Sequence, residues 1–152
     1  MKIISKNRRL AFDYEITEKR QTGIVLSGHE VKAIKTWHTN ISNAFCKIKN
    51  KEIYVNNMDI PLYDKTNIRI APWYEPLWSR KLLMTRREIL KIYTLTDKTA
   101  MNLFPVELYV DDRWLVKLTI WLCKIRRKVD KKELIKDRDI KKQVAKEFKN
   151  FK

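Results

Sequence analysis

The chain has only two glycines in 152 residues, Gly23 and Gly28, and they stand five positions apart. Glycine takes left-handed backbone conformations, and lets another segment approach closely, without steric cost. We therefore expect a left-handed or a closely approached position at these glycines. Gly23 is predicted to begin a strand after a tight turn. Gly28 is predicted to form the corner at which that strand turns into a helix.

The middle of the chain has the periodicity of short strands with few helices. Residues 12–19 alternate apolar and polar side chains, whereas Val31, Ile34 and Trp37 recur at the helical interval of three. The predicted strands are 12–19, 23–27, 44–50, 52–60, 79–84 and the two arms of 104–124, with hairpin turns at Asn50–Lys51 and Asp111–Asp112; the predicted helices are 29–37 and 85–95, the second with Thr85 and Glu88 at capping-box spacing. This pattern predicts a mainly β protein built on a small closed antiparallel β-barrel.

The net charge is +16, from 34 lysines and arginines against 18 acidic residues. Such an excess repels itself on compaction, so a polyanionic partner is expected, nucleic acid ahead of an anionic membrane surface or a merely solvated lysine-rich face. The N-terminus lacks the apolar segment of a signal peptide, and the sequence contains no membrane-span pattern. Cys46 and Cys123 have no metal-site or disulfide spacing, so we expect a reducing, cytoplasmic location.

Residues 124–152 form a tail of different character, with thirteen basic and five acidic residues. Ile140, Val144, Phe148 and Phe151 would lie on one narrow face of a helix. This helix could pack its apolar face on the barrel, or the segment could be disordered alone and fold in an anionic groove; the thin stripe favours the second. We predict an RNA-binding barrel over 1–123 and a separate tail over 124–152.

Signatures of catalysis are scarce. His29 and His38 are the only histidines, and neither has metal-ligand spacing. A metal-dependent nuclease needs converging carboxylates, and convergence of Asp13, Glu30 and Asp59 cannot be derived from the sequence. We therefore predict a protein that is not an enzyme and has no cofactor or metal, with Glu30 stabilising the first turn of its helix.

Aromatic and basic residues interleave over 73–83. Trp73, Tyr74 and Trp78 stand beside Arg80 and Lys81, an arrangement that suits base stacking and phosphate contact. The alternative is that these rings are core or loop anchors. We predict that Arg80 and Lys81 contact phosphate, with further basic surface at Arg86, Arg87 and residues 6–10, where Asn7 can hydrogen-bond RNA.

The stretch GIVLSGHEVKAIK at 23–35 closely resembles the signature of the SmpB family (small protein B, the tmRNA-binding proteins). Further blocks resemble the same family in the same order: NRRLAFDYEI, TNIS, DIPLY, EPLWSRKLLMTRREI, VELYVDDRWLVKL and VDKKELIKDRD. The chain departs from the family pattern at Gln21, where an acid is usual, and at Trp37, Trp121 and Ile125, where glycines are usual.

The resemblance implies an oligonucleotide-binding (OB) type β-barrel with about three helices. It implies a monomer that binds the tRNA-like domain of tmRNA and delivers it to stalled ribosomes for trans-translation, meeting elongation factor Tu through the charged tmRNA. The tail would enter the mRNA channel beside the decoding centre of the small subunit and become helical there. The alternative is a generic single-stranded RNA-binding OB protein.

Carried over position by position, the resemblance also implies site residues. For tmRNA binding these are Asn7, Arg8, Glu30, Lys32, Arg80, Lys81 and Leu83. For the decoding-site tail they are Lys124, Arg126, Arg127, Asp130, Lys131, Lys132, Ile140, Val144 and Phe148.

Overall fold

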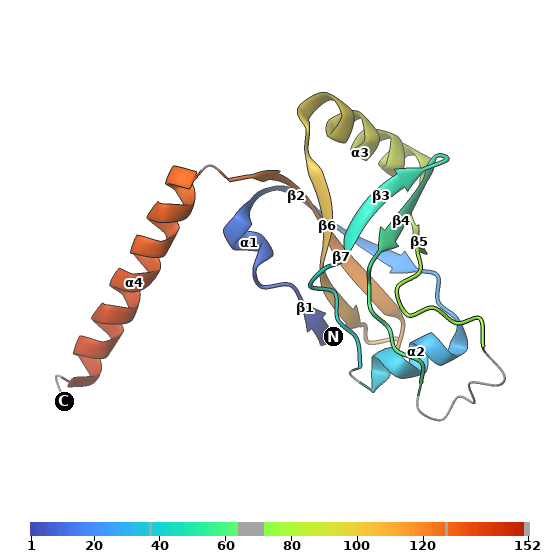
Figure 1. The fold of residues 1–152 in the computed structure, drawn as a ribbon, viewed down its shortest axis with the longest axis horizontal. Helices are drawn as coiled ribbons and strands as arrows, with labels where there is room; N and C mark the ends of the chain where they lie inside the picture. The colour runs from blue at the N-terminus through green and yellow to red at the C-terminus, as the bar shows by residue number, and fades with distance from the viewer. Residues whose placement is uncertain (37, 64–71, 127, 151–152) are drawn as a thin grey trace.

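The computed structural model describes residues 1–36, 38–63, 72–126 and 128–150, without the side chains of 128–130 (Figure 1). Trp37, Arg127, Phe151 and the side chain of Asp130 therefore lie outside the described residues. The described residues contain seven strands and four helices, in the order β1 Lys2–Lys6, α1 Leu10–Asp13, β2 Tyr14–Ile24, α2 Gly28–Lys35, β3 Phe45–Lys49, β4 Glu52–Asn56, β5 Arg80–Leu83, α3 Arg86–Thr99, β6 Asn102–Val110, β7 Val116–Ile125 and α4 Lys128–Asn150. The mainly β prediction is confirmed.

The strands form one antiparallel sheet in the order β1-β6-β7-β2-β5-β4-β3. Within the described residues β1 and β3 remain at the ends of this order, so the sheet is not closed and the predicted closed barrel is not confirmed. The reason is that β1 pairs with the outer edge of β6, from Lys2 opposite Val110 to Lys6 opposite Glu107. Side chains still join the two ends in one core, in which Cys46 and Ile53 belong to the same cluster as Leu108 and Ile120.

The longest strand replaces a predicted turn. Residues 12–19 and 23–27 were expected as two strands, but β2 runs without interruption from Tyr14 to Ile24 and pairs with β7 over most of its length. Its side chains alternate between exposed and half-buried through the polar residues 19–21. A polar stretch therefore continues a strand here because only one of its faces is covered. The strand β1 and the short helix α1 were also not predicted.

Neither glycine occupies the backbone conformation that the sequence predicted. Five described residues have positive φ, and all of them carry a Cβ atom: Asn50, Lys51, Asn57, Ala100 and Trp114. Asn50 and Lys51, with φ of 53° and 62°, form the predicted hairpin turn between β3 and β4. Gly23 lies inside β2, and Gly28 is the first residue of α2 with open space where its Cβ would be. The prediction that the corner before α2 requires glycine is therefore wrong.

Helix α3 begins as predicted and ends later. The Thr85 hydroxyl accepts from the Glu88 N–H, and the Glu88 carboxylate accepts from the Thr85 N–H at 3.0 Å, which is the capping box. The hydrogen bond from the Thr85 backbone lowers the pKa of Glu88. Helices α3 and α2 lie at opposite ends of the sheet (Figure 1). The predicted helix 29–37 corresponds to α2, Gly28–Lys35.

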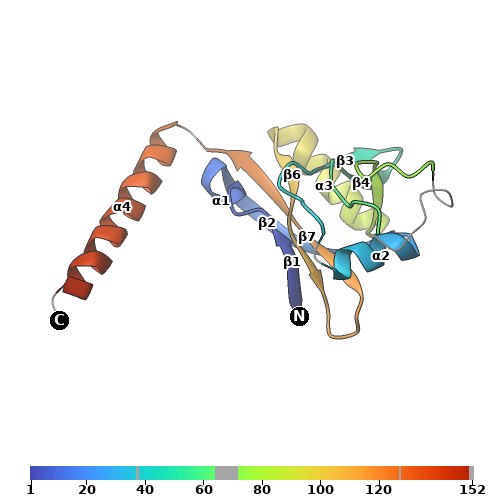
Figure 2. The ribbon, with the colours of Figure 1, turned by 60° about the horizontal axis from the view of Figure 1, so that its bottom comes forward.

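The basic tail contains one helix of 23 residues, α4, which projects away from the sheet (Figure 2). Ile140, Val144 and Phe148 are exposed along it, so the alternative in which this stripe packs on the barrel is wrong. Contacts with α1 hold the near end: Lys131 Nζ lies 3.4 Å from Asp13 Oδ1, and Arg138 lies over the Phe12 ring. Disorder of the tail in the free protein stays a prediction.

The described helices include none with the length and apolar character needed to cross a membrane. Both cysteines are free and buried. Burial raises the pKa of Cys46 and raises that of Cys123 to about 11, which keeps both thiols protonated near neutral pH.

Replacing Gly28 with alanine tests the corrected view of this residue. Because Gly28 has no positive φ, and the methyl group of an alanine there would meet no atom within 4 Å, Gly28→Ala should raise the free energy of unfolding by about 0.4–1 kcal/mol. Urea denaturation measures the change. Gly23→Ala is the control without this gain, because its Cβ would lie 3.2 Å from Leu83 Cδ1. A destabilised Gly28→Ala protein would show that the corner does require glycine.

Candidate nucleic-acid interface

A buried ion pair joins helix α2 to strand β5. Glu30, in the first turn of α2, and Arg80, the first residue of β5, are 2% and 3% exposed, and Arg80 Nε donates to Glu30 Oε2 at 2.9 Å. Removing either charge alone would leave the other buried without its partner, which is strongly unfavourable. The two elements are therefore fixed to each other at this point.

Every N–H of the Arg80 guanidinium has an acceptor. Besides Nε, Nη1 donates to the carbonyls of Met58 and Trp78, and Nη2 donates to the Tyr74 hydroxyl and the Pro76 carbonyl. Arginine has five such donors in a rigid fork, so its capacity is fully used. Arg80 thus organises the segment that leads into β5.

Strand geometry decides which side chains of β5 are exposed. Burial alternates along its four residues, so Arg80 and Leu82 point inward while Lys81 and Leu83 point outward. The prediction that Arg80 contacts phosphate does not fit this structure, because its guanidinium is enclosed and has no free donor. Lys81 is exposed and lies 3.0 Å from Glu52, a surface pair that a phosphate can replace.

Four rings form a cluster beside the ion pair, and two of them, Tyr74 and Trp78, contact it. Trp73 and Trp78 stack with ring centroids 5.7 Å apart and an interplanar angle of 17°, and Tyr74 meets Trp78 edge-on. The His29 ring meets Tyr74 edge-on with centroids 4.7 Å apart. We call His29, Trp73, Tyr74 and Trp78 the aromatic cluster.

The two interpretations of these aromatic residues apply to different rings. Tyr74 is a loop anchor, since its hydroxyl donates to the Ile60 carbonyl at 2.5 Å and burial raises its pKa. Trp78 is also an anchor, because its N–H donates to Glu30 Oε1 at 3.3 Å. Trp73 is 61% exposed and presents a ring to solvent.

Gly23 has a packing role at this surface. It pairs with Leu83 across β2 and β5, and a Cβ at Gly23 would lie 3.2 Å from Leu83 Cδ1. The Thr22 hydroxyl donates to the Leu83 carbonyl at 2.9 Å. Leu83 is therefore held against the strand while it stays exposed. Lys32, exposed on α2, lies one helical turn from His29 and so on the same side of the helix.

Asn7 and Arg8 lie apart from the residues of α2 and β5. They line a groove of about 530 Å³ with Phe45 and with the ring pair Tyr14–Phe104, whose centroids are 4.7 Å apart. Asn7 is buried and donates from Nδ2 to the Ser42 carbonyl at 3.3 Å, whereas Arg8 is exposed. The structure thus does not bring these two together with the residues of α2 and β5. Neither Tyr14 nor Phe104 was singled out from the sequence, although both are aromatic positions in strands.

The predicted tail residues that the structure describes lie near the same groove or along α4. Arg126 Nε donates to the carbonyls of Ala11 and Tyr14, at 3.3 and 3.2 Å. Lys124 and Lys132 are exposed, and Lys131 pairs with Asp13, which also lines the groove.

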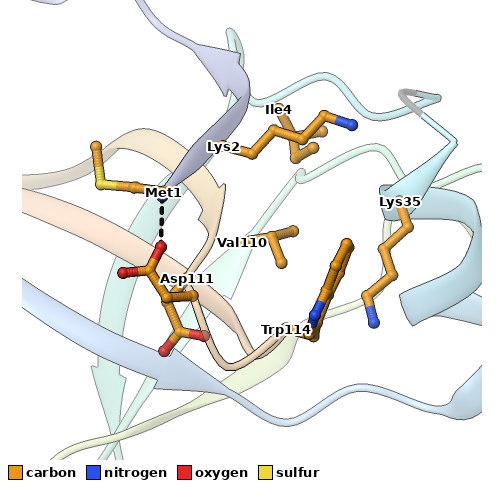
Figure 3. Close-up of a pocket in the computed structure, with 8 residues that line it drawn as sticks. Met1, Lys2, Ile4, Lys35, Val110, Asp111 and Trp114 are labelled. Atoms are coloured by element: carbon orange, nitrogen blue, oxygen red, sulfur yellow. Dashed lines mark hydrogen bonds and ion pairs between the residues drawn. The ribbon is translucent and has the colours of Figure 1, made fainter.

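A second exposed tryptophan lies at the other end of α2. Trp114, 71% exposed, shares a pocket of about 280 Å³ with Lys35, whose Nζ lies 5.8 Å from the ring centroid (Figure 3). The N-terminal amine pairs with Asp112 at the rim of this pocket. The described residues that line it include no member of the aromatic cluster.

Two of the three carboxylates considered for a nuclease form ion pairs at separate places. Glu30 pairs with Arg80 at one site and Asp13 with Lys131 at another. In the described part of the chain no group of three histidine, cysteine or acidic residues could hold a metal ion.

Comparison with known proteins identifies the family. The family model described as "SmpB protein" matches residues 4–150, almost the whole chain. The chain belongs to the SmpB family. SsrA-binding proteins of Coprothermobacter proteolyticus and Thermoanaerobacter pseudethanolicus are 38% and 39% identical to it over 149 residues, covering 98% of this chain and 98% and 93% of theirs. A chain of the solved structure "tmRNA-SmpB: a journey to the center of the bacterial ribosome" matches with a TM-score of 0.65 and 28% identity, over 89% of this chain and 95% of that one.

Substitutions at neighbouring positions of β5 test the assigned roles in this SmpB-family chain. Arg80→Ala leaves Glu30 buried and unpaired, so it should lower the free energy of unfolding by about 3–5 kcal/mol. Lys81→Ala removes only an exposed ion pair and should cost less than about 1 kcal/mol. Urea denaturation of both variants checks the difference. Similar small losses would show that the Glu30–Arg80 pair does not hold the site together.

Proposed function

We propose that this chain binds the tRNA-like domain of tmRNA and delivers it to stalled ribosomes for trans-translation. It acts by binding rather than by catalysis. The relatives named SsrA-binding proteins support this proposal, since the match extends over nearly the full length of both chains. The similar solved structure, named for tmRNA and SmpB on the bacterial ribosome, supports the same partners.

The observation that carries the proposal is that the family signature coincides with a built surface. Glu30 of the signature helix pairs with Arg80, which joins α2, the helix that carries Lys32, to β5, the strand that carries Lys81 and Leu83. In our proposal Lys32, Lys81 and Leu83 contact tmRNA because their side chains reach solvent. Glu30 and Arg80 act as positioning residues that hold the contacting elements in register.

In this proposal the tail binds the ribosome. Helix α4 is strongly basic and exposed along its length, which suits the anionic walls of an empty mRNA channel beside the decoding centre. The groove that contains Arg8 lies beside α1, which contacts α4, so both could face the small subunit together. Elongation factor Tu is an indirect partner through the charged tmRNA, and the site of action is the cytoplasm, where these partners work.

Selectivity for a tRNA-like fold separates this function from generic single-strand binding on an OB-type sheet. The chain should bind the tRNA-like domain of its cognate tmRNA at least about tenfold more tightly than elongator tRNA. An excess of unlabelled single-stranded oligonucleotide should leave the complex intact. Competition gel shifts at a fixed salt concentration measure both, since salt sets the electrostatic part of the affinity. Displacement by the oligonucleotide would favour the generic binder.

Removing the tail should separate the two proposed activities. Deletion of residues 128–152 should leave affinity for the tRNA-like domain within about threefold, because α2 and β5 do not include the tail. The same deletion should abolish tagging on stalled ribosomes in a reconstituted translation assay.

A matched variant keeps the charge of the tail. Ile140→Ser, Val144→Ser and Phe148→Ser together remove only the apolar stripe, and we expect reduced tagging with unchanged tmRNA affinity. Loss of tmRNA binding on deletion would contradict this division of roles.

A further inference from the structure

Trp73 presents a large aromatic face to solvent while it is held from the other side. Its ring stacks on Trp78, with centroids 5.7 Å apart and planes 17° from parallel, yet 61% of the residue is exposed. One face of the indole is covered by Trp78, so much of the exposed surface must come from the opposite face. A flat, accessible π-surface of this kind is what an unpaired nucleic-acid base stacks on.

The supports beneath Trp73 are fixed before any ligand arrives. Trp78 donates to Glu30, and Glu30 is held by Arg80, whose donors all have acceptors. His29 adds an edge contact to Trp73, with centroids 6.4 Å apart. A ring that is already oriented loses little conformational entropy on binding, which makes its contact energetically effective.

Positive charge lies on the adjacent turn of α2. Lys32 follows His29 by three residues, and positions three apart are neighbours on a helix surface. Lys32 is exposed, so its ammonium group can reach a phosphate next to a stacked base. Stacking and phosphate contact therefore come from one small area.

We propose that an unpaired base of the bound RNA stacks on the exposed face of Trp73, while Lys32 contacts a neighbouring phosphate. The proposal rests on the proposed tmRNA-binding function and adds a base-binding subsite to it. The subsite selects a base that is not paired, because a base inside a duplex has no free face. It recognises the face of the base and so accepts any of the four.

Three substitutions of Trp73 test the stacking contact on the full-length chain. The probe is the tRNA-like domain of tmRNA, and affinity is measured by fluorescence anisotropy. Trp73→Ala and Trp73→Leu should weaken binding by roughly ten- to a hundredfold, because both remove the ring and leucine keeps apolar bulk. Trp73→Phe keeps a ring and should stay within about threefold of the wild type.

The salt dependence of binding separates the loss of a stacking contact from the loss of a phosphate contact. Trp73→Leu should leave the slope of log affinity against log salt unchanged, because stacking releases no counterion. Lys32→Ala should reduce that slope by roughly 0.7–0.9, the value for one lost phosphate contact. Trp114→Ala is the matched control, since it removes an equally exposed tryptophan from the other end of α2 and should leave affinity unchanged.

The outcomes separate this inference from the function on which it rests. Wild-type affinity in Trp73→Ala and Trp73→Leu would overturn the stacking subsite and leave tmRNA binding standing. Equal losses in Trp114→Ala and Trp73→Ala would also overturn it. Failure of the wild-type chain to bind the tRNA-like domain would overturn the proposed function itself.

Discussion

The buried pair of Glu30 and Arg80 is the interaction on which the rest of the surface depends. It ties the first turn of α2 to the start of β5, and the remaining donors of Arg80 hold the loop between β4 and β5 through Met58, Tyr74 and Pro76. The acidic end of the pair also suits the positive end of the helix dipole. These two charged side chains have a structural role, and the exposed side chains around them are the ones available for binding.

The periodicity of apolar residues predicted most helices and strands, because it shows which side chains of a local segment are buried. The strand at β5 is an example, while local motifs predicted the capping box of α3 and the Asn50–Lys51 hairpin. Periodicity did not predict the continuous strand β2, because its polar residues are held in the strand by pairing with β7, which is distant in the sequence. The open sheet was missed for the same reason: the pairing of β1 with β6 joins residues more than a hundred positions apart.

The sequence predicted which residues belong to the candidate site, but not what each of them does there. The sequence identified Arg80 and the aromatic residues, yet residue type alone does not tell an inward arginine from an outward one. The alternation in β5 decides this, and it places Lys81 and Leu83 outside. The same reasoning explains two positions at which the chain lacks the family's usual glycine. Trp121 and Ile125 stand in regular β pairing with Lys19 and Tyr14, where a side chain is accommodated without strain.

The left-handed residues at the turns have a consequence for how the protein could evolve or be engineered. Lys51, Ala100 and Trp114 hold a conformation that costs a side-chain-bearing residue roughly 1 kcal/mol, and glycine would relieve it. The few glycines elsewhere make the unfolded chain less varied, which offsets part of that cost. Thermal tolerance can therefore be adjusted at the corners of the sheet by single substitutions, while the junction of α2 and β5 keeps its sequence.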